Sequence, residues 1–166
     1  MKQERLQELL ATQFNSQRLL PLQIIYLAIT AGVVVLFTVG FILGLRSAGQ
    51  TVSKFAAVLA YISMAAPVLI FFISNKIFMR RVSAIAGEGD VFGQLRAALL
   101  AKAGIVESGA LVGVVAWLLI CLRTHLSFIP PVYYGVFAGL FVMLLNTAIY
   151  LPTPGRIRRW LSDKGD

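Results

Sequence analysis

The stretch that decides the fold is LLPLQIIYLAITAGVVVLFTVGFILGL, residues 19–45, which contains no charged side chain. Three further stretches are similar and contain a single charge between them, at Glu107: residues 55–75, 103–122 and 126–155. A helix needs about 20 apolar residues to cross the hydrocarbon core of a bilayer, and in lipid its backbone groups must be hydrogen-bonded within the segment. We therefore predict four transmembrane helices, over residues 20–45, 55–79, 98–122 and 129–151.

The composition supports this prediction. Of the 166 residues, 58% are hydrophobic and only 13% are charged, whereas soluble domains have about 25% charged residues. Four crossings account for most of this length, which leaves no room for a separate catalytic domain. We expect one integral membrane domain over residues 1–166, folded as an all-α bundle of four transmembrane helices with short interfacial helices at both ends.

The net charge of +8 predicts an orientation rather than a nucleic-acid partner. In membrane proteins, Lys and Arg gather on the cytoplasmic side and contact lipid headgroups, so the expected partner of these charges is the lipid bilayer. Three of the 15 basic residues fall in the two loops expected outside, and the other twelve fall at the opposite ends of the helices: Lys2, Arg5, Arg18, Lys76, Arg80, Arg81, Arg96, Lys102, Arg156, Arg158, Arg159 and Lys164. This split predicts a multi-pass protein of the inner (plasma) membrane with both termini in the cytoplasm.

The N-terminal segment, residues 1–17, has apolar side chains at helical spacing among charged ones. This pattern is typical of a helix that lies on the membrane surface or of a helix that docks on a partner, and the sequence leaves both interpretations open.

The C-terminal segment begins with a helix-start signal, because Thr153 is a good N-cap and Pro154 suits a first turn. In such a helix the apolar side chains of Ile157 and Leu161 are expected to face lipid. Four further side chains are expected to anchor the helix at the lipid headgroups: Arg156, Arg158, Arg159 and Trp160.

Three predicted helices contain two glycines four residues apart, a spacing that lets another helix approach closely. The pairs are Gly40 with Gly44, Gly109 with Gly113, and Gly135 with Gly139. They indicate either close packing inside one bundle or an interface between subunits of an oligomer.

Glu107 is the one acidic residue within a predicted transmembrane helix. It lies five residues past Lys102, about 7 Å deeper along the helix axis, and an ionisable group at such a depth indicates a functional site. At 100° per residue, four residues share its face, Ala103, Ala110, Leu111 and Val114, while Gly109 and Gly113 lie on the opposite side. We expect protein to cover both faces. By depth the candidate hydrogen-bond partners of Glu107 are Asn146, Thr30, Gln23 and Ser63. A structural hydrogen bond, a proton or cation site, and a contact to another subunit are the three roles that remain open.

Signals for catalysis are missing from the sequence. The chain has one cysteine and one histidine, and it contains neither a nucleophile–base pair nor a Gly-Lys-Ser/Thr phosphate loop. The acidic stretch at residues 86–90 has a turn composition that does not match a calcium loop. We therefore expect a non-enzyme with no metal and no cofactor.

Two family resemblances can be quoted. Residues 106–113, VESGALVG, resemble the acidic helix of the rotor-ring c subunits of ATP synthases, in which a carboxylate carries a proton or sodium ion; the glycine repeat of that family is absent from residues 20–45. Motifs along the whole chain resemble uncharacterised small bacterial membrane proteins with four helices: residues 25–28 (IYLA), Glu107 followed by Ala110 and Leu111, and Pro152-Thr153 followed by Arg156. The second resemblance implies a fold but no activity.

Together these features predict a structural or accessory membrane protein that self-associates or joins a larger membrane complex. The alternative is a small carrier or channel coupled to protons or cations through Glu107.

Overall fold

The computed structural model describes residues 14, 16–85 and 90–162, and it confirms the all-α prediction. Four segments are long and apolar enough to cross a membrane, which indicates a multi-pass membrane protein. In chain order the helices are α2 (Ser16–Arg46), α3 (Lys54–Ala84), α4 (Val91–Cys121), the 3-10 helices η1 (Leu126–Phe128) and η2 (Pro131–Phe137), α5 (Ala138–Tyr150) and α6 (Pro154–Ser162). Most of the segment predicted as an N-terminal helix (residues 1–17), and residues 86–89 of the stretch with a turn composition, lie outside the described residues.

Two helices are longer than the uncharged stretches predicted. Helix α3 continues to Ala84 rather than 79, and α4 begins at Val91 rather than 98. Charged side chains such as Arg80 and Arg96 end an apolar stretch but favour helix, so the helices continue beyond it. Helix α4 begins where the carboxylate of Asp90 accepts a hydrogen bond of 2.8 Å from the backbone N–H of Gly93, which is a regular N-cap.

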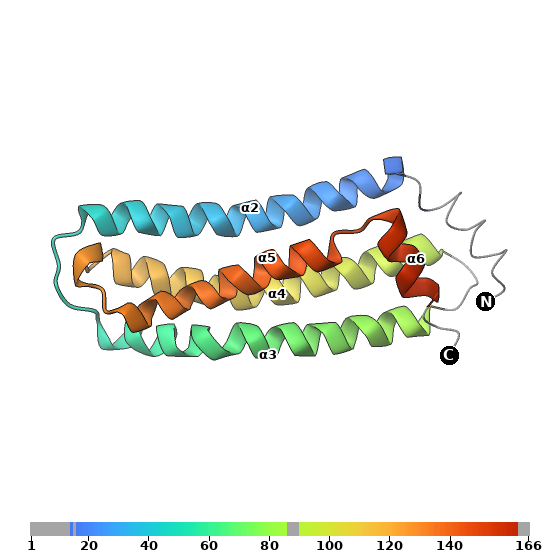
Figure 1. The fold of residues 1–166 in the computed structure, drawn as a ribbon. Helices are drawn as coiled ribbons and strands as arrows, with labels where there is room; N and C mark the ends of the chain where they lie inside the picture. Colours follow the sequence, from blue (N-terminus) through green and yellow to red (C-terminus); the bar gives the residue numbers. More distant parts are fainter. Residues whose placement is uncertain (1–13, 15, 86–89, 163–166) are drawn as a thin grey trace.

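The helices form a bundle in which α2 and α3 lie on opposite sides of the α4–α5 pair (Figure 1). Helix α4 packs against α2, α3 and α5, and α5 also packs against α2 and α3. In the most apolar stretch of α4, 50% of the residues are buried, against 22% in α3. Helix α4 is therefore the central helix, while α2 and α3 present most of their apolar surface outward.

Helix α6 lies across one end of the bundle (Figure 1). The side chains of Ile157 and Leu161 are 0% and 2% exposed and belong to the hydrophobic core. The expectation that they face lipid is therefore wrong: the apolar face of this short amphipathic helix packs onto the ends of the transmembrane helices. As predicted, the Thr153 hydroxyl accepts a hydrogen bond from the backbone N–H of Arg156, at 3.4 Å.

The four side chains expected at the headgroups differ in exposure. Arg156 is partly buried and donates to the backbone oxygen of Leu151 at 3.1 Å, whereas Arg158 and Arg159 are exposed. The ring of Trp160 stacks on Tyr150, with ring centres 5.9 Å apart. Trp160 therefore packs on the bundle and stays partly exposed.

Candidate functional site

Glu107 lies at the edge of the outward face of α4. Its side chain is partly exposed, and no hydrogen bond or ion pair reaches its carboxylate from the residues that the structure describes. Of the neighbours expected to share its face, Ala103, Ala110 and Val114 are buried, but Leu111 is 37% exposed. The expected protein cover is thus present on one side of Glu107 and missing on the other.

Asn146, the leading candidate partner of Glu107, points elsewhere. Gly139 of α5 meets Ala110 of α4, and because the two helices run antiparallel, Asn146 comes level with Ala103. That level is about 6 Å from the level of Glu107 along the axis. Neither polar atom of the Asn146 side chain has a hydrogen-bond partner in the described part of the chain. The predicted hydrogen bond to Glu107 is therefore not formed.

The amide of Asn146 is itself unusual. The side chain is 0% exposed, and neither its nitrogen nor its oxygen has a hydrogen-bond partner in the described part of the chain. Buried polar groups in proteins are nearly always paired, because an unpaired one has lost its hydrogen bonds to water. Asn146 therefore costs stability where it stands.

The other three predicted partners are bonded within the bundle, and the side-chain amide of Gln23 donates to the backbone oxygen of Pro152 at 2.6 Å. The hydroxyls of Thr30 and Thr147 share a hydrogen bond of 2.6 Å that joins α2 to α5. The hydroxyl of Ser63 donates to the backbone oxygen of Ala60 in its own helix, at 2.8 Å. All three side chains are bonded to the chain's own atoms rather than to Glu107.

Lys102 is the charged group that the sequence analysis missed. We predicted it to lie with the basic residues at the helix ends, but its side chain is 1% exposed inside the bundle. Its ammonium donates to the Asn75 Oδ1 at 3.2 Å and lies 3.5 Å from the ring centre of Tyr150. The Tyr150 hydroxyl donates to the same Asn75 oxygen. Because apolar residues lie on every side of this helix, no pattern in the sequence marks position 102 as facing inward.

Aromatic side chains complete the surroundings of Lys102. The rings of Phe71 and Phe78 lie 5.2 Å and 5.5 Å from its nitrogen, within reach of a cation–π interaction. Trp160 of α6 meets Phe78 edge-on, with ring centres 5.4 Å apart. Hence α6 covers the rings of Phe78 and Tyr150, and the lysine is held by an acceptor and aromatic faces that all belong to this chain.

All six predicted packing glycines face another segment of the same chain. A side-chain carbon added at Gly139 would lie 2.9 Å from the Cα of Ala110, and one at Gly113 would lie 2.6 Å from the backbone oxygen of Val136. The neighbours that an added side-chain carbon would meet are, in chain order, Trp117 at Gly40, Leu126 at Gly44, Ile70 at Gly109, Val136 at Gly113, Met64 at Gly135 and Ala110 at Gly139. These glycines are therefore used inside the bundle.

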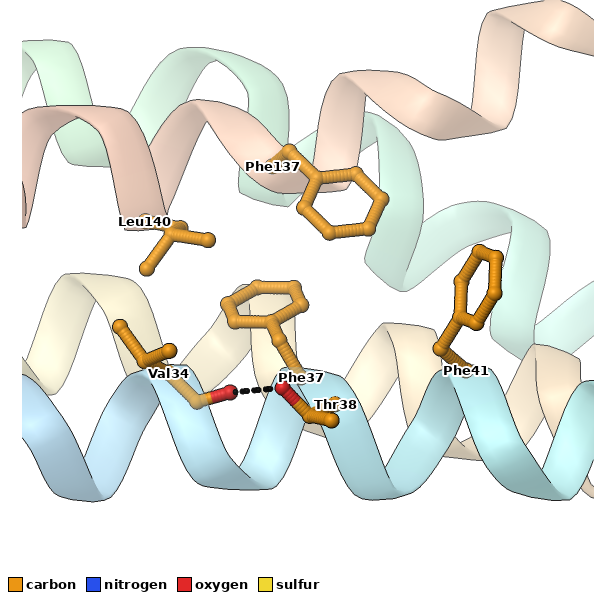
Figure 2. A pocket seen from close by; sticks show the side chains of 6 residues that line it. All are labelled: Val34, Phe37, Thr38, Phe41, Phe137 and Leu140. Atoms are coloured by element: carbon orange, nitrogen blue, oxygen red, sulfur yellow. Dashed lines mark hydrogen bonds between the residues drawn. The ribbon is translucent and has the colours of Figure 1, made fainter.

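Two apolar grooves open on the surface that the structure describes. The first, of about 290 Å³, lies between α2 and the start of the last transmembrane segment, where the rings of Phe37 and Phe137 stack with centres 4.9 Å apart (Figure 2). Its one hydroxyl, on Thr38, donates to the backbone oxygen of Val34 at 2.9 Å. The second groove, of about 250 Å³, is lined by Leu59 of α3 and by four residues of α4: Ser108, Leu111, Val112 and Val115.

Comparisons with known proteins add no relative. The chain matches no family model, no curated protein and no solved structure. Over the described residues, no group of three or more His, Cys, Asp or Glu side chains is placed to hold a metal ion.

Proposed function

We propose that this protein is a non-catalytic accessory subunit of a larger membrane complex. The observation that carries the proposal is the position of Glu107, an intramembrane carboxylate on the outward edge of α4 without a partner in the described part of the chain. A carboxylate facing lipid costs about 2–3 kcal/mol on insertion scales. A neighbouring protein that donates to Glu107 removes this cost, and the complex is stabilised accordingly.

The packing of the interior favours a rigid subunit over a protein that changes conformation during its function. The buried ammonium of Lys102 is bonded to Asn75 and lies against aromatic rings, and the threonine hydroxyls of α2 and α5 are bonded to each other. The central helices meet at glycines such as Gly113 and Gly139, where an added side-chain carbon would lie less than 3.0 Å from the neighbouring backbone. Interiors packed in this way resist rearrangement, as a scaffold requires.

The carrier alternative needs a hydrated route to Glu107. Two grooves on the described surface do not provide such a route, because they are lined almost wholly by apolar side chains and Glu107 lines neither of them. This geometry favours a contact with protein at Glu107 over ion transfer through it.

We further propose that the end of the bundle bearing α6 lies in the cytoplasm of a cell with this protein in its inner membrane. That end carries Arg18, Arg80, Arg81 and Arg96 together with the arginines of α6, whereas the other end carries Arg46, Lys54 and Arg123. A membrane-impermeant thiol reagent added from outside should label Ala48→Cys and leave Arg158→Cys unlabelled. The native Cys121 is buried, so it does not interfere. The reverse pattern contradicts this orientation.

The accessory role is tested by native mass measurement after purification from the original membranes in a mild detergent. We expect a mass above that of one 18.1 kDa chain, with a second protein present. In a parallel assay, the purified chain in vesicles with a pH gradient should give no proton flux that Glu107→Gln abolishes. A chain that purifies alone and shows such flux refutes the accessory role.

A further inference from the structure

The outward face of α4 has the spacing of a helix–helix seam. Gly104, Ser108, Leu111 and Val115 are all exposed, and they follow one another at intervals of four, three and four residues. This is the heptad spacing of two helices packed side by side. Nothing lies within 4 Å of a side-chain carbon added at Gly104, so, unlike the six glycines of the core, Gly104 contacts no neighbouring segment of the bundle.

The chemistry of this seam suits a membrane helix. Small residues at Gly104 and Ser108 permit close approach, which drives helix association in lipid. The Ser108 hydroxyl donates to the backbone oxygen of Ile105 at 2.7 Å, so it does not obstruct an apolar surface. Toward the other end, the groove of about 250 Å³ formed with Leu59 receives larger side chains.

Glu107 flanks the seam, and its charge determines which kind of helix can bind there. It directly precedes Ser108 and lies three residues after Gly104, where paired helices place their interhelical ion pairs. The occupant must therefore present a cation at this depth. A second copy inserted in the same orientation presents another Glu107 there, since Lys102 is buried and the other basic residues of the described helices, such as Arg96 and Arg123, lie toward the bundle ends.

We infer that this seam docks a single transmembrane helix of a different protein, carrying a Lys or Arg that pairs with Glu107. The inference rests on the proposed accessory role and specifies the partner's chemistry. The small residues let the helices approach, and the ion pair sets register and orientation.

A designed probe tests the site without the natural partner. Two leucine-based transmembrane peptides, identical except for Lys or Leu at the depth of Glu107, are titrated against the labelled protein in phosphatidylcholine vesicles, and binding is followed by energy transfer. The wild-type protein should bind the Lys peptide about 5- to 30-fold more tightly. This preference should vanish in Glu107→Gln. Gly104→Leu should weaken the binding of both peptides, and Gly32→Leu, at an equally open outward glycine of α2, should change nothing.

The outcomes separate this site from the proposed function. Equal binding of the two peptides by the wild type, or a Lys preference that survives in Glu107→Gln, overturns the docking site; a native mass above 18.1 kDa would then still support the accessory role. Energy transfer between two labelled copies of this chain that depends on Glu107 overturns the basic partner helix. A Lys preference in a chain that purifies alone from its membranes refutes the accessory role while leaving the seam intact.

Discussion

Lys102 and Glu107 lie five residues apart on α4, but they differ in burial and in hydrogen bonding. Lys102 is buried, bonded to Asn75 and surrounded by aromatic rings. Glu107 lies at the outward edge of the helix, without a partner in the described residues. Charged groups in membranes are normally paired or functional. The difference teaches that Lys102 belongs to the stability of the bundle, whereas no described residue holds the carboxylate of Glu107, for which we have proposed a partner in another protein.

Removing the hydrogen-bond acceptor of Lys102 should reduce the stability of the bundle more than any other substitution considered below. In Asn75→Leu the buried ammonium of Lys102 loses its hydrogen-bond acceptor, and so does the Tyr150 hydroxyl. Removing the partner of a buried charge typically costs about 3–5 kcal/mol, and we expect a loss of this size in unfolding experiments in mild detergent. Lys102→Met, which removes the charge itself, is the matched control and should cost less. Equal losses in both variants would contradict a role for Asn75 in holding the charge.

The buried Gly113 and the exposed Gly104 allow the inward and outward sides of α4 to be compared by the same substitution. In Gly113→Leu the new side chain meets the backbone oxygen of Val136, where the first added carbon already lies 2.6 Å away. Overpacking of this kind costs about 1–3 kcal/mol. Gly104→Leu places the same side chain in open space, so the isolated chain should keep its stability or gain slightly in helix propensity. Melting temperatures in detergent compare the two variants, and equal losses would show that α4 has no free face.

Replacing Asn146 by Leu should change the free energy of unfolding in the opposite direction to Asn75→Leu. Its buried amide has no partner among the described residues, so Asn146→Leu removes an unsatisfied polar group and fills the space with apolar atoms of similar size. We expect a gain of about 1–2 kcal/mol, read from the same unfolding curves as Asn75→Leu. A loss of stability would mean that the amide is bonded and belongs to the same network as Lys102.

The outward carboxylate should matter least to the isolated chain. Glu107→Ala and Glu107→Gln should each change the free energy of unfolding of the purified protein by less than about 0.5 kcal/mol. No bond inside the described bundle is lost, and the outward carboxylate meets the same detergent in the folded and the unfolded protein, so its insertion cost cancels. If Glu107→Ala cost 1 kcal/mol or more while Glu107→Gln cost nothing, the carboxylate would have an internal hydrogen bond.

The sequence predicted the parts of this fold that depend on one-dimensional patterns. Stretches without charge gave the four helices, and the 100° step per residue placed Gly109 and Gly113 away from Glu107. The helix ends were missed at charged positions such as Arg80, because hydropathy marks where lipid ends and not where the helix ends.

The parts that were missed depend on which neighbour covers a face. All sides of a transmembrane helix are apolar, so periodicity does not tell a lipid-facing side from a protein-facing one. The apolar face of α6 has the same pattern whether it meets lipid or Phe78, and for this reason Ile157 and Leu161 were assigned to lipid. Lys102 was counted with the topology charges, although the predicted helix already included it.

The separate roles of the two faces of α4 are tested most directly by photo-cross-linking in the original membranes. A photoreactive residue is placed at Leu111, beside Glu107 on the seam, and at Val35, which is 58% exposed on α2. We expect a cross-link to a different protein at position 111, its loss when Glu107→Ala is added, and no cross-link to protein at position 35. Equal cross-linking at both positions, a product of two copies of this chain, or a product that persists in Glu107→Ala would contradict a partner paired with Glu107.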